Sequence, residues 1–168
     1  RLDEMHAEVL SAQSAFSEDP QLVVFISCIA AGINLANERV SEARALLERL
    51  SDVPIAPGLV LLVGAIWREL AKKHASRDEF AEALVAVRRS IAIHREDYEA
   101  WVLNGLYEIE RADSQKAVDA FKIAWKLDPR STLSSPTLWR ALTRAGEMIN
   151  QAKTKAIQSK LAMYKRVV

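Results

Sequence analysis

The feature that most constrains this sequence is a recurrence of similar residues at a spacing of 34 positions. Trp67 and Trp101 are one such pair, and four further pairs keep both the spacing and the size class: Ala71 and Gly105, Ala83 and Ala117, Val87 and Phe121, and Ser90 and Ala124. A period of this length is typical of proteins built from repeated helix–turn–helix units. Because one such unit cannot bury its apolar face alone, at least three units must stack to form a core.

Helix-forming residues fill the chain between a few short breaks. Only five glycines and five prolines interrupt the 168 residues, and no segment shows the period-two alternation of a strand. The breaks predict helices over residues 21–36, 40–50, 59–75, 78–94, 98–110 and 114–127, with a loop at 51–58 and a closing turn at 128–131. A final helical region is predicted from Pro136 onward. The expected fold class is therefore all-α.

Composition excludes several classes of protein. The length of 168 residues predicts one domain, and a composition that is 50% hydrophobic and 27% charged predicts that it is folded and not a disordered tail. A net charge of +1 gives no strong whole-protein attraction to nucleic acid or to an anionic membrane. Cys28 is the single cysteine of the sequence, and its apolar neighbours favour a buried thiol. No apolar stretch is long enough to span a bilayer, and a cytoplasmic location is the default expectation.

The unit over residues 98–131 carries large and small residues at the spacing of a known repeat: Trp101, Gly105, Ala117, Phe121, Ala124 and Pro129. On these residues the sequence resembles the tetratricopeptide repeat (TPR) family. The unit over 64–97 keeps part of the pattern with Trp67, Leu70, Ala71 and Ala83. A weaker unit over about 21–54 keeps Ala30, Ala31, Ala43, Leu47 and Leu50, and residues 1–20 look like the end of a partial repeat.

The resemblance implies a right-handed α-solenoid of antiparallel helix pairs, with TPR-like repeats over residues 1–135. Residues 136–168 are expected to close the solenoid as a basic C-terminal capping helix, or two. This region has seven basic residues and one acidic residue, a net charge of +6. The preceding 135 residues have sixteen basic and twenty-one acidic residues, a net charge of −5.

No motif in the sequence indicates catalysis. The three histidines, at positions 6, 74 and 94, share no metal-ligand spacing, and there is no glycine-rich phosphate loop or nucleophile motif. We therefore expect no enzyme activity, no metal, no cofactor and no small-molecule substrate.

The resemblance implies instead a protein or peptide partner, because TPR-like domains usually bind peptides against the first helix of each pair. Mapped onto this sequence, that concave surface presents Arg68, Lys72, Glu99, Val102, Leu106, Arg140 and Arg144. The basic residues come in two pairs one helical turn apart, so the members of a pair point the same way. Two basic pairs beside an apolar strip suit an extended peptide with acidic and hydrophobic side chains. The predicted function is a protein–protein interaction module, as an adaptor, a scaffold subunit or a chaperone-like holder.

A second hypothesis concerns the basic end of the chain. Its cations, Lys153, Lys155, Lys160, Lys165 and Arg166, suit an anionic membrane or nucleic acid. Only Tyr164 is placed to stack on a base, which disfavours nucleic acid, and a solubilising end cap is the simpler interpretation. The apolar ends of a solenoid also favour self-association into a homo-oligomer.

Overall fold

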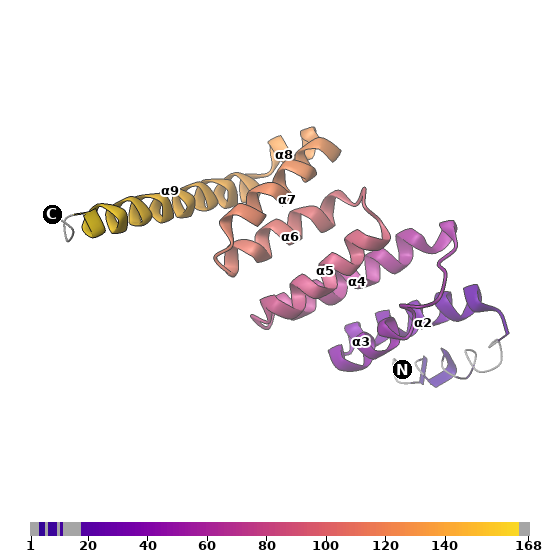
Figure 1. Cartoon of the computed structure of the whole chain (residues 1–168). Coiled ribbons are helices and arrows are strands. Elements are labelled where there is room, and N and C mark those ends of the chain that lie inside the picture. Colours follow the sequence, from indigo (N-terminus) through magenta and orange to yellow (C-terminus); the bar gives the residue numbers. More distant parts are fainter. Residues whose placement is uncertain (1–3, 6, 10, 12–17, 165–168) are drawn as a thin grey trace. The chain divides into compact units, whose positions relative to one another are not determined.

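The computed structural model describes residues 4, 5, 7–9, 11 and 18–164, and every regular element that it describes is a helix (Figure 1). The elements are α2 (Pro20–Ala36), α3 (Val40–Glu48), the 3₁₀ helix η1 (Pro57–Leu59), α4 (Val60–Ala75), α5 (Phe80–Ile93), α6 (Tyr98–Glu110), α7 (Ser114–Leu127), α8 (Pro129–Ser134) and α9 (Pro136–Tyr164). The predicted all-α class is confirmed. Most of the predicted partial repeat at 1–20 lies outside the described residues.

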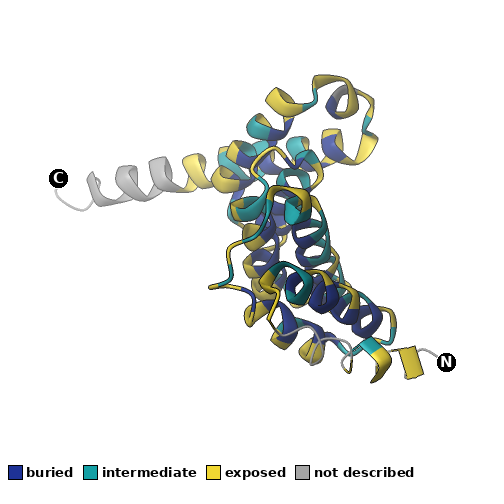
Figure 2. Cartoon of the chain, turned by 90° about the vertical axis from the view of Figure 1, so that its right-hand side faces the viewer, coloured by how far each residue is buried: buried dark blue, intermediate teal, exposed yellow. Residues whose placement is uncertain are grey.

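The chain divides into two compact units, residues 1–100 and residues 101–168. In the first unit α2 packs on α3 and α4 packs on α5, and α4 also contacts both helices of the preceding pair. Its core consists of fully buried aliphatic and small side chains, among them Val24, Ala43, Leu47, Leu70 and Leu84. In Figure 2 buried residues, coloured dark blue, recur along the helices and alternate with exposed residues. The predicted boundary between repeats and capping region at 135–136 stays a prediction.

Three helix pairs reverse direction through the same backbone turn. One residue in each turn has a left-handed conformation: Glu38 (φ 60°), Asp78 (φ 59°) and Ala112 (φ 60°). The amide that follows donates to a carbonyl five residues earlier: Arg39 to Asn34 (2.8 Å), Glu79 to His74 (3.1 Å) and Asp113 to Glu108 (2.9 Å). This arrangement satisfies carbonyls that the end of a helix would otherwise leave without partners. The repeat in the sequence is therefore also a repeat of turn geometry, although no glycine marks it.

A long connection joins α3 to α4. Ala43 and Ala83 are 40 residues apart, six more than the repeat period, and the extra residues lie in this connection. The side chain of Gln21 on α2 fixes it from both sides: its Nε2 donates to the carbonyl of Pro54 (2.7 Å), and its Oε1 accepts from the amide of Ala56 (2.8 Å). The connection therefore has a defined conformation against the first helix pair.

In the second unit α7 contacts both α8 and α9. The α8 helix occupies the place of the predicted closing turn. It forms because Asp128 caps it, accepting hydrogen bonds from the Ser131 amide (3.0 Å) and hydroxyl (2.6 Å). The first half of α9 buries Leu138, Ala141 and Ala145 at helical spacing, whereas residues 150–155 are all exposed. In the part of the chain that the structure describes, no helix combines the length and the apolar character that crossing a membrane requires.

Candidate partner-binding surfaces

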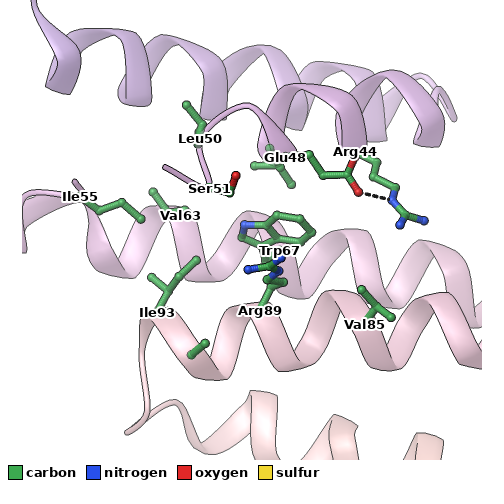
Figure 3. A pocket seen from close by; sticks show the side chains of 12 residues that line it. Arg44, Glu48, Leu50, Ser51, Ile55, Val63, Trp67, Val85, Arg89 and Ile93 are labelled. Atoms are coloured by element: carbon green, nitrogen blue, oxygen red, sulfur yellow. Dashed lines mark hydrogen bonds and ion pairs between the residues drawn. The ribbon is translucent and has the colours of Figure 1, made fainter. Parts of the chain in front are cut away.

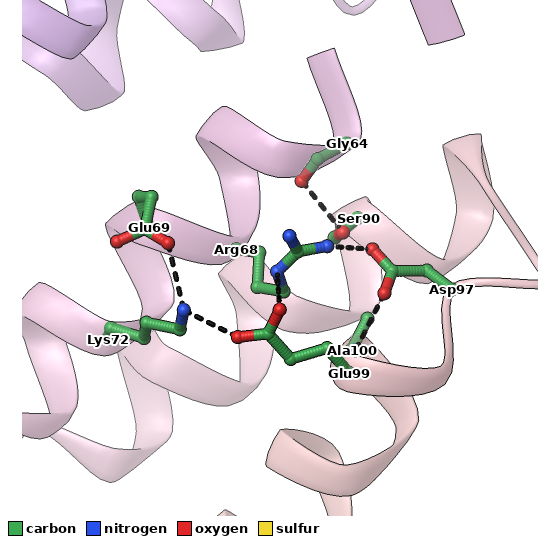
Figure 4. Close-up of polar contacts among 8 residues, drawn as sticks. All are labelled: Gly64, Arg68, Glu69, Lys72, Ser90, Asp97, Glu99 and Ala100. Atoms are coloured by element: carbon green, nitrogen blue, oxygen red, sulfur yellow. Dashed lines mark hydrogen bonds and ion pairs between the residues drawn. The ribbon is translucent and has the colours of Figure 1, made fainter. Parts of the chain in front are cut away.

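Arg68 and Lys72 on α4 point the same way, as predicted, and both meet carboxylates of their own chain (Figure 4). The guanidinium of Arg68 pairs with Asp97, and its Nε lies 3.2 Å from Glu99 Oε2. Lys72 Nζ lies 2.6 Å from the other oxygen of Glu99 and 2.8 Å from Glu69 Oε1. The first basic pair is thus part of a five-residue ionic cluster with three carboxylates and two cations.

The cluster links α4 to Asp97 and Glu99, near the end of the first unit. Asp97 Oδ1 also accepts from the amide of Ala100 (3.1 Å), so one carboxylate both caps α6 and pairs with Arg68. Burial alone would lower the pKa of Lys72. Hydrogen bonds and charge attraction from Glu69 and Glu99 outweigh this effect, so the pKa of Lys72 lies above its ordinary value. A partner contact by Arg68, Lys72 or Glu99 stays a prediction, and an acidic peptide would have to compete with these carboxylates.

In the second unit a groove of about 240 Å³ runs between α6 and α9. It brings together three of the predicted partner-binding residues, Leu106, Arg140 and Arg144, with Ile109 and Ala141 between them. Val102, which is half-buried, precedes Leu106 by one turn on the same helix. The groove therefore has an apolar floor on α6 and two arginines one turn apart on α9. We call it the α6–α9 groove.

The two arginines of the α6–α9 groove differ in what they contact. Arg144 Nη1 lies 2.7 Å from Glu110 Oε1 at the end of α6. Arg140 is exposed, and among the described residues no carboxylate lies within ion-pair distance of it. Its charge is therefore available to an anion that enters the groove.

The basic patch is described only in part. Lys153 and Lys155 are exposed and form no ion pair with a described residue. They border a hollow of about 420 Å³ between α9 and the turn that joins α6 to α7. The side chain of Lys160, and the whole of Lys165 and Arg166, lie outside the described residues.

Cys28 and His74 are both buried within the first unit. Cys28 is fully buried, as predicted, and burial raises the pKa of its thiol to about 11. His74 is buried, and its Nδ1 lies 2.6 Å from Glu79 Oε2 across the turn between α4 and α5. Within the described residues no three histidine, cysteine or acidic side chains are placed to hold a metal ion.

This chain is similar in fold to a solved protein structure, but its sequence matches neither a protein-family model nor a curated protein. Among solved structures, the crystal structure of MamA is similar over 95% of this chain and 91% of its own, with a TM-score of 0.63 and 14% sequence identity. MamA has a TPR-like helical fold. The chain therefore has a TPR-like all-α solenoid fold, as its repeat period predicted.

Proposed function

We propose that this chain is a protein–protein interaction module that binds an extended peptide in the α6–α9 groove. The observation that carries the proposal is the position of Arg140 beside an apolar floor: it is an exposed cation to which no described residue offers a carboxylate. A helix-lined groove of this kind anchors apolar side chains on its floor, while charged residues at its edge orient the peptide. An adaptor, a scaffold subunit or a chaperone-like holder would each use the surface in this way.

The groove defines which peptides should bind. A carboxylate facing Arg140 forms a charge-assisted, two-pronged hydrogen bond that a neutral side chain cannot make. A leucine, isoleucine or phenylalanine one or two residues away would then cover Leu106 and Ile109. Because the groove holds about 240 Å³, one such side chain fills it, and the affinity should be that of a transient complex.

A random peptide library displayed against the whole chain tests the proposal. Selected peptides should combine an acidic with a large apolar residue, and fluorescence anisotropy should show weaker binding to the Arg140→Glu and Leu106→Glu variants. We expect a loss of about tenfold or more, because hydrogen bonds to charged groups contribute about 1.5–3 kcal/mol. Lys126→Glu is the control, since Lys126 is exposed on α7 and does not line the groove. Selected peptides that bind both groove variants as tightly as the native chain would contradict the proposal.

A second candidate function is binding of an anionic surface by the basic patch. Its support is that Lys153 and Lys155 are exposed and carry their charges without ion pairs to described residues. Such binding depends on screened charge and should vanish as salt rises from about 50 to 300 mM. Vesicles containing phosphatidylserine distinguish the two candidates. The double variant Lys153→Glu/Lys155→Glu should abolish binding to them, and Leu106→Glu should leave it unchanged.

A further inference from the structure

A second concave site lies in the first unit, on elements that the α6–α9 groove does not use (Figure 3). It is a pocket of about 470 Å³ between α3 and α5, with Val63 and Trp67 of α4 between them. Its apolar lining includes Leu50, Ile55, Val63, Trp67 and Ala92. Pockets that hold small molecules have about this size and this mostly apolar lining.

The long connection between α3 and α4 explains why the pocket exists. Ser51 and Ile55 line it, and both come from the residues that extend this connection beyond the repeat period. Since Gln21 holds the connection at Pro54 and Ala56, Ile55 is fixed at the edge of the pocket before any ligand arrives. Because this wall of the pocket is already ordered, a ligand that binds there does not lose affinity to the entropy cost of ordering the loop.

The polar groups of the pocket are mostly hydrogen-bond donors. Arg44 and Glu48 form an ion pair of 2.7 Å on α3, so their charges balance. Arg89 on α5 is exposed and has no carboxylate partner among the described residues, and no described residue accepts a hydrogen bond from Trp67 Nε1. A guanidinium and an indole N–H can only donate, so a ligand that satisfies them must offer acceptors. The net positive charge favours an anion.

We propose that this pocket binds a small molecule with an apolar body and a single carboxylate. The apolar body lies against Leu50, Ile55 and Val63, and the carboxylate faces Arg89. Three helices and the connection wall the pocket, which suits a compact molecule better than an extended polypeptide. The lining does contain Ser51 and Glu48, but the Glu48 carboxylate is paired with Arg44 (2.7 Å), so we assign the molecule as a bound ligand.

Isothermal titration calorimetry of the whole chain with 2-naphthylacetate, which measures the binding affinity, tests this proposal. Arg89→Glu should weaken binding about tenfold or more, because it replaces the guanidinium that faces the carboxylate with a negative charge. Arg49→Glu makes the same charge change on an exposed residue of the first unit that does not line the pocket, and should bind as the native chain does. The neutral analogue 2-naphthylacetamide has the same shape and should bind about tenfold more weakly than the carboxylate.

A second variant tests the location independently of charge. Ala92 lines the pocket and is exposed, so Ala92→Phe should fill it while leaving the helix folded, and should abolish binding. Circular dichroism of each variant would check that it is folded. Equal affinity for the carboxylate and the amide, full binding by Ala92→Phe, or no binding by the native chain would each overturn the proposal.

Discussion

Gly105 of α6 lies directly against the ring of Phe121 on α7, and a Cβ atom at this position would clash with three atoms of that ring. The close approach lets Phe121 be almost fully buried between the two helices. It also explains why the repeat places a small residue here, as the 34-residue pattern predicted.

Gly105→Ala should therefore destabilise the protein, although alanine is the better helix former. The clash costs about 1–3 kcal/mol, more than the gain of about 1 kcal/mol from helix propensity. The matched control is Gly146→Ala on α9, where a Cβ would meet nothing within 4 Å. Urea denaturation should show a lower midpoint for the first variant and an equal or higher one for the second. A stabilised Gly105→Ala variant would mean that α6 and α7 are further apart than the structure has them.

Ala112→Gly should have the opposite effect on stability. Ala112 has a φ of 60°, a left-handed conformation that costs a residue with a Cβ about 1–2 kcal/mol and costs glycine little. We expect the free energy of unfolding to rise by about 1 kcal/mol. Ala45→Gly is the control, because Ala45 is exposed in the middle of α3, where glycine should destabilise by about the same amount. If both variants lose stability, the turn between α6 and α7 does not have this geometry.

Acid should weaken the contact between the first two helix pairs through Glu38. Lys73, on α4, and Arg77, in the turn after it, both form ion pairs with the Glu38 carboxylate. Their hydrogen bonds and charge attraction hold the pKa of Glu38 below its ordinary value. A carboxylate with a lowered pKa contributes stability at neutral pH, and this contribution disappears as the pH falls below about 4. Glu38→Gln should thus lower the melting temperature at pH 7 and have a smaller effect at pH 3.

The control for this pH dependence is Glu42→Gln, because Glu42 is exposed and forms no ion pair with a described residue. It should shift the melting temperature little at either pH. An effect of Glu38→Gln that is equal at both pH values would contradict the assignment of these ion pairs.

Cys28 should react slowly with thiol reagents in the folded protein. Its side chain is fully buried, and with a pKa of about 11 the thiol is protonated at pH 8. Since the thiolate is the reactive form, 5,5′-dithiobis(2-nitrobenzoate) should modify the native chain at least about a hundredfold more slowly than the chain in urea. Equal rates in the two conditions would show that α2 opens readily.

Much of the fold could be predicted from the sequence, because the repeat is a local signal. The helices predicted over 98–110 and 114–127 have the observed bounds of α6 and α7, although only the end of α7 lies near a proline and none of these ends lies next to a glycine. The α8 helix was missed, because a proline after an aspartate marks the end of one helix as readily as the capped start of the next. The left-handed turns were missed because glutamate and alanine rarely adopt a positive φ, and an aspartate such as Asp78 is only a weak signal for one.

The surfaces were harder to predict, because ionic contacts depend on tertiary placement. Arg68 and Asp97 are 29 positions apart, and nothing local shows that the cap of α6 would also neutralise a cation on α4. The pocket between α3 and α5 could not be predicted from the sequence for the same reason, because its lining residues come from three helices and a connection. Spacing did predict that Arg140 and Arg144 share a face, because that relation lies within one helix.

The central claim is that Arg140 forms an ion pair with a carboxylate of a bound peptide. Reversing the charge on each partner in turn tests this claim most directly. Fluorescence anisotropy would compare the tightest selected acidic peptide, and the same peptide with lysine at its acidic position, on the native chain and on Arg140→Glu. We predict that the acidic peptide binds the native chain, that the lysine peptide binds the variant, and that both crossed combinations are weaker by about tenfold or more. An unchanged preference for the acidic peptide in the variant would contradict the account.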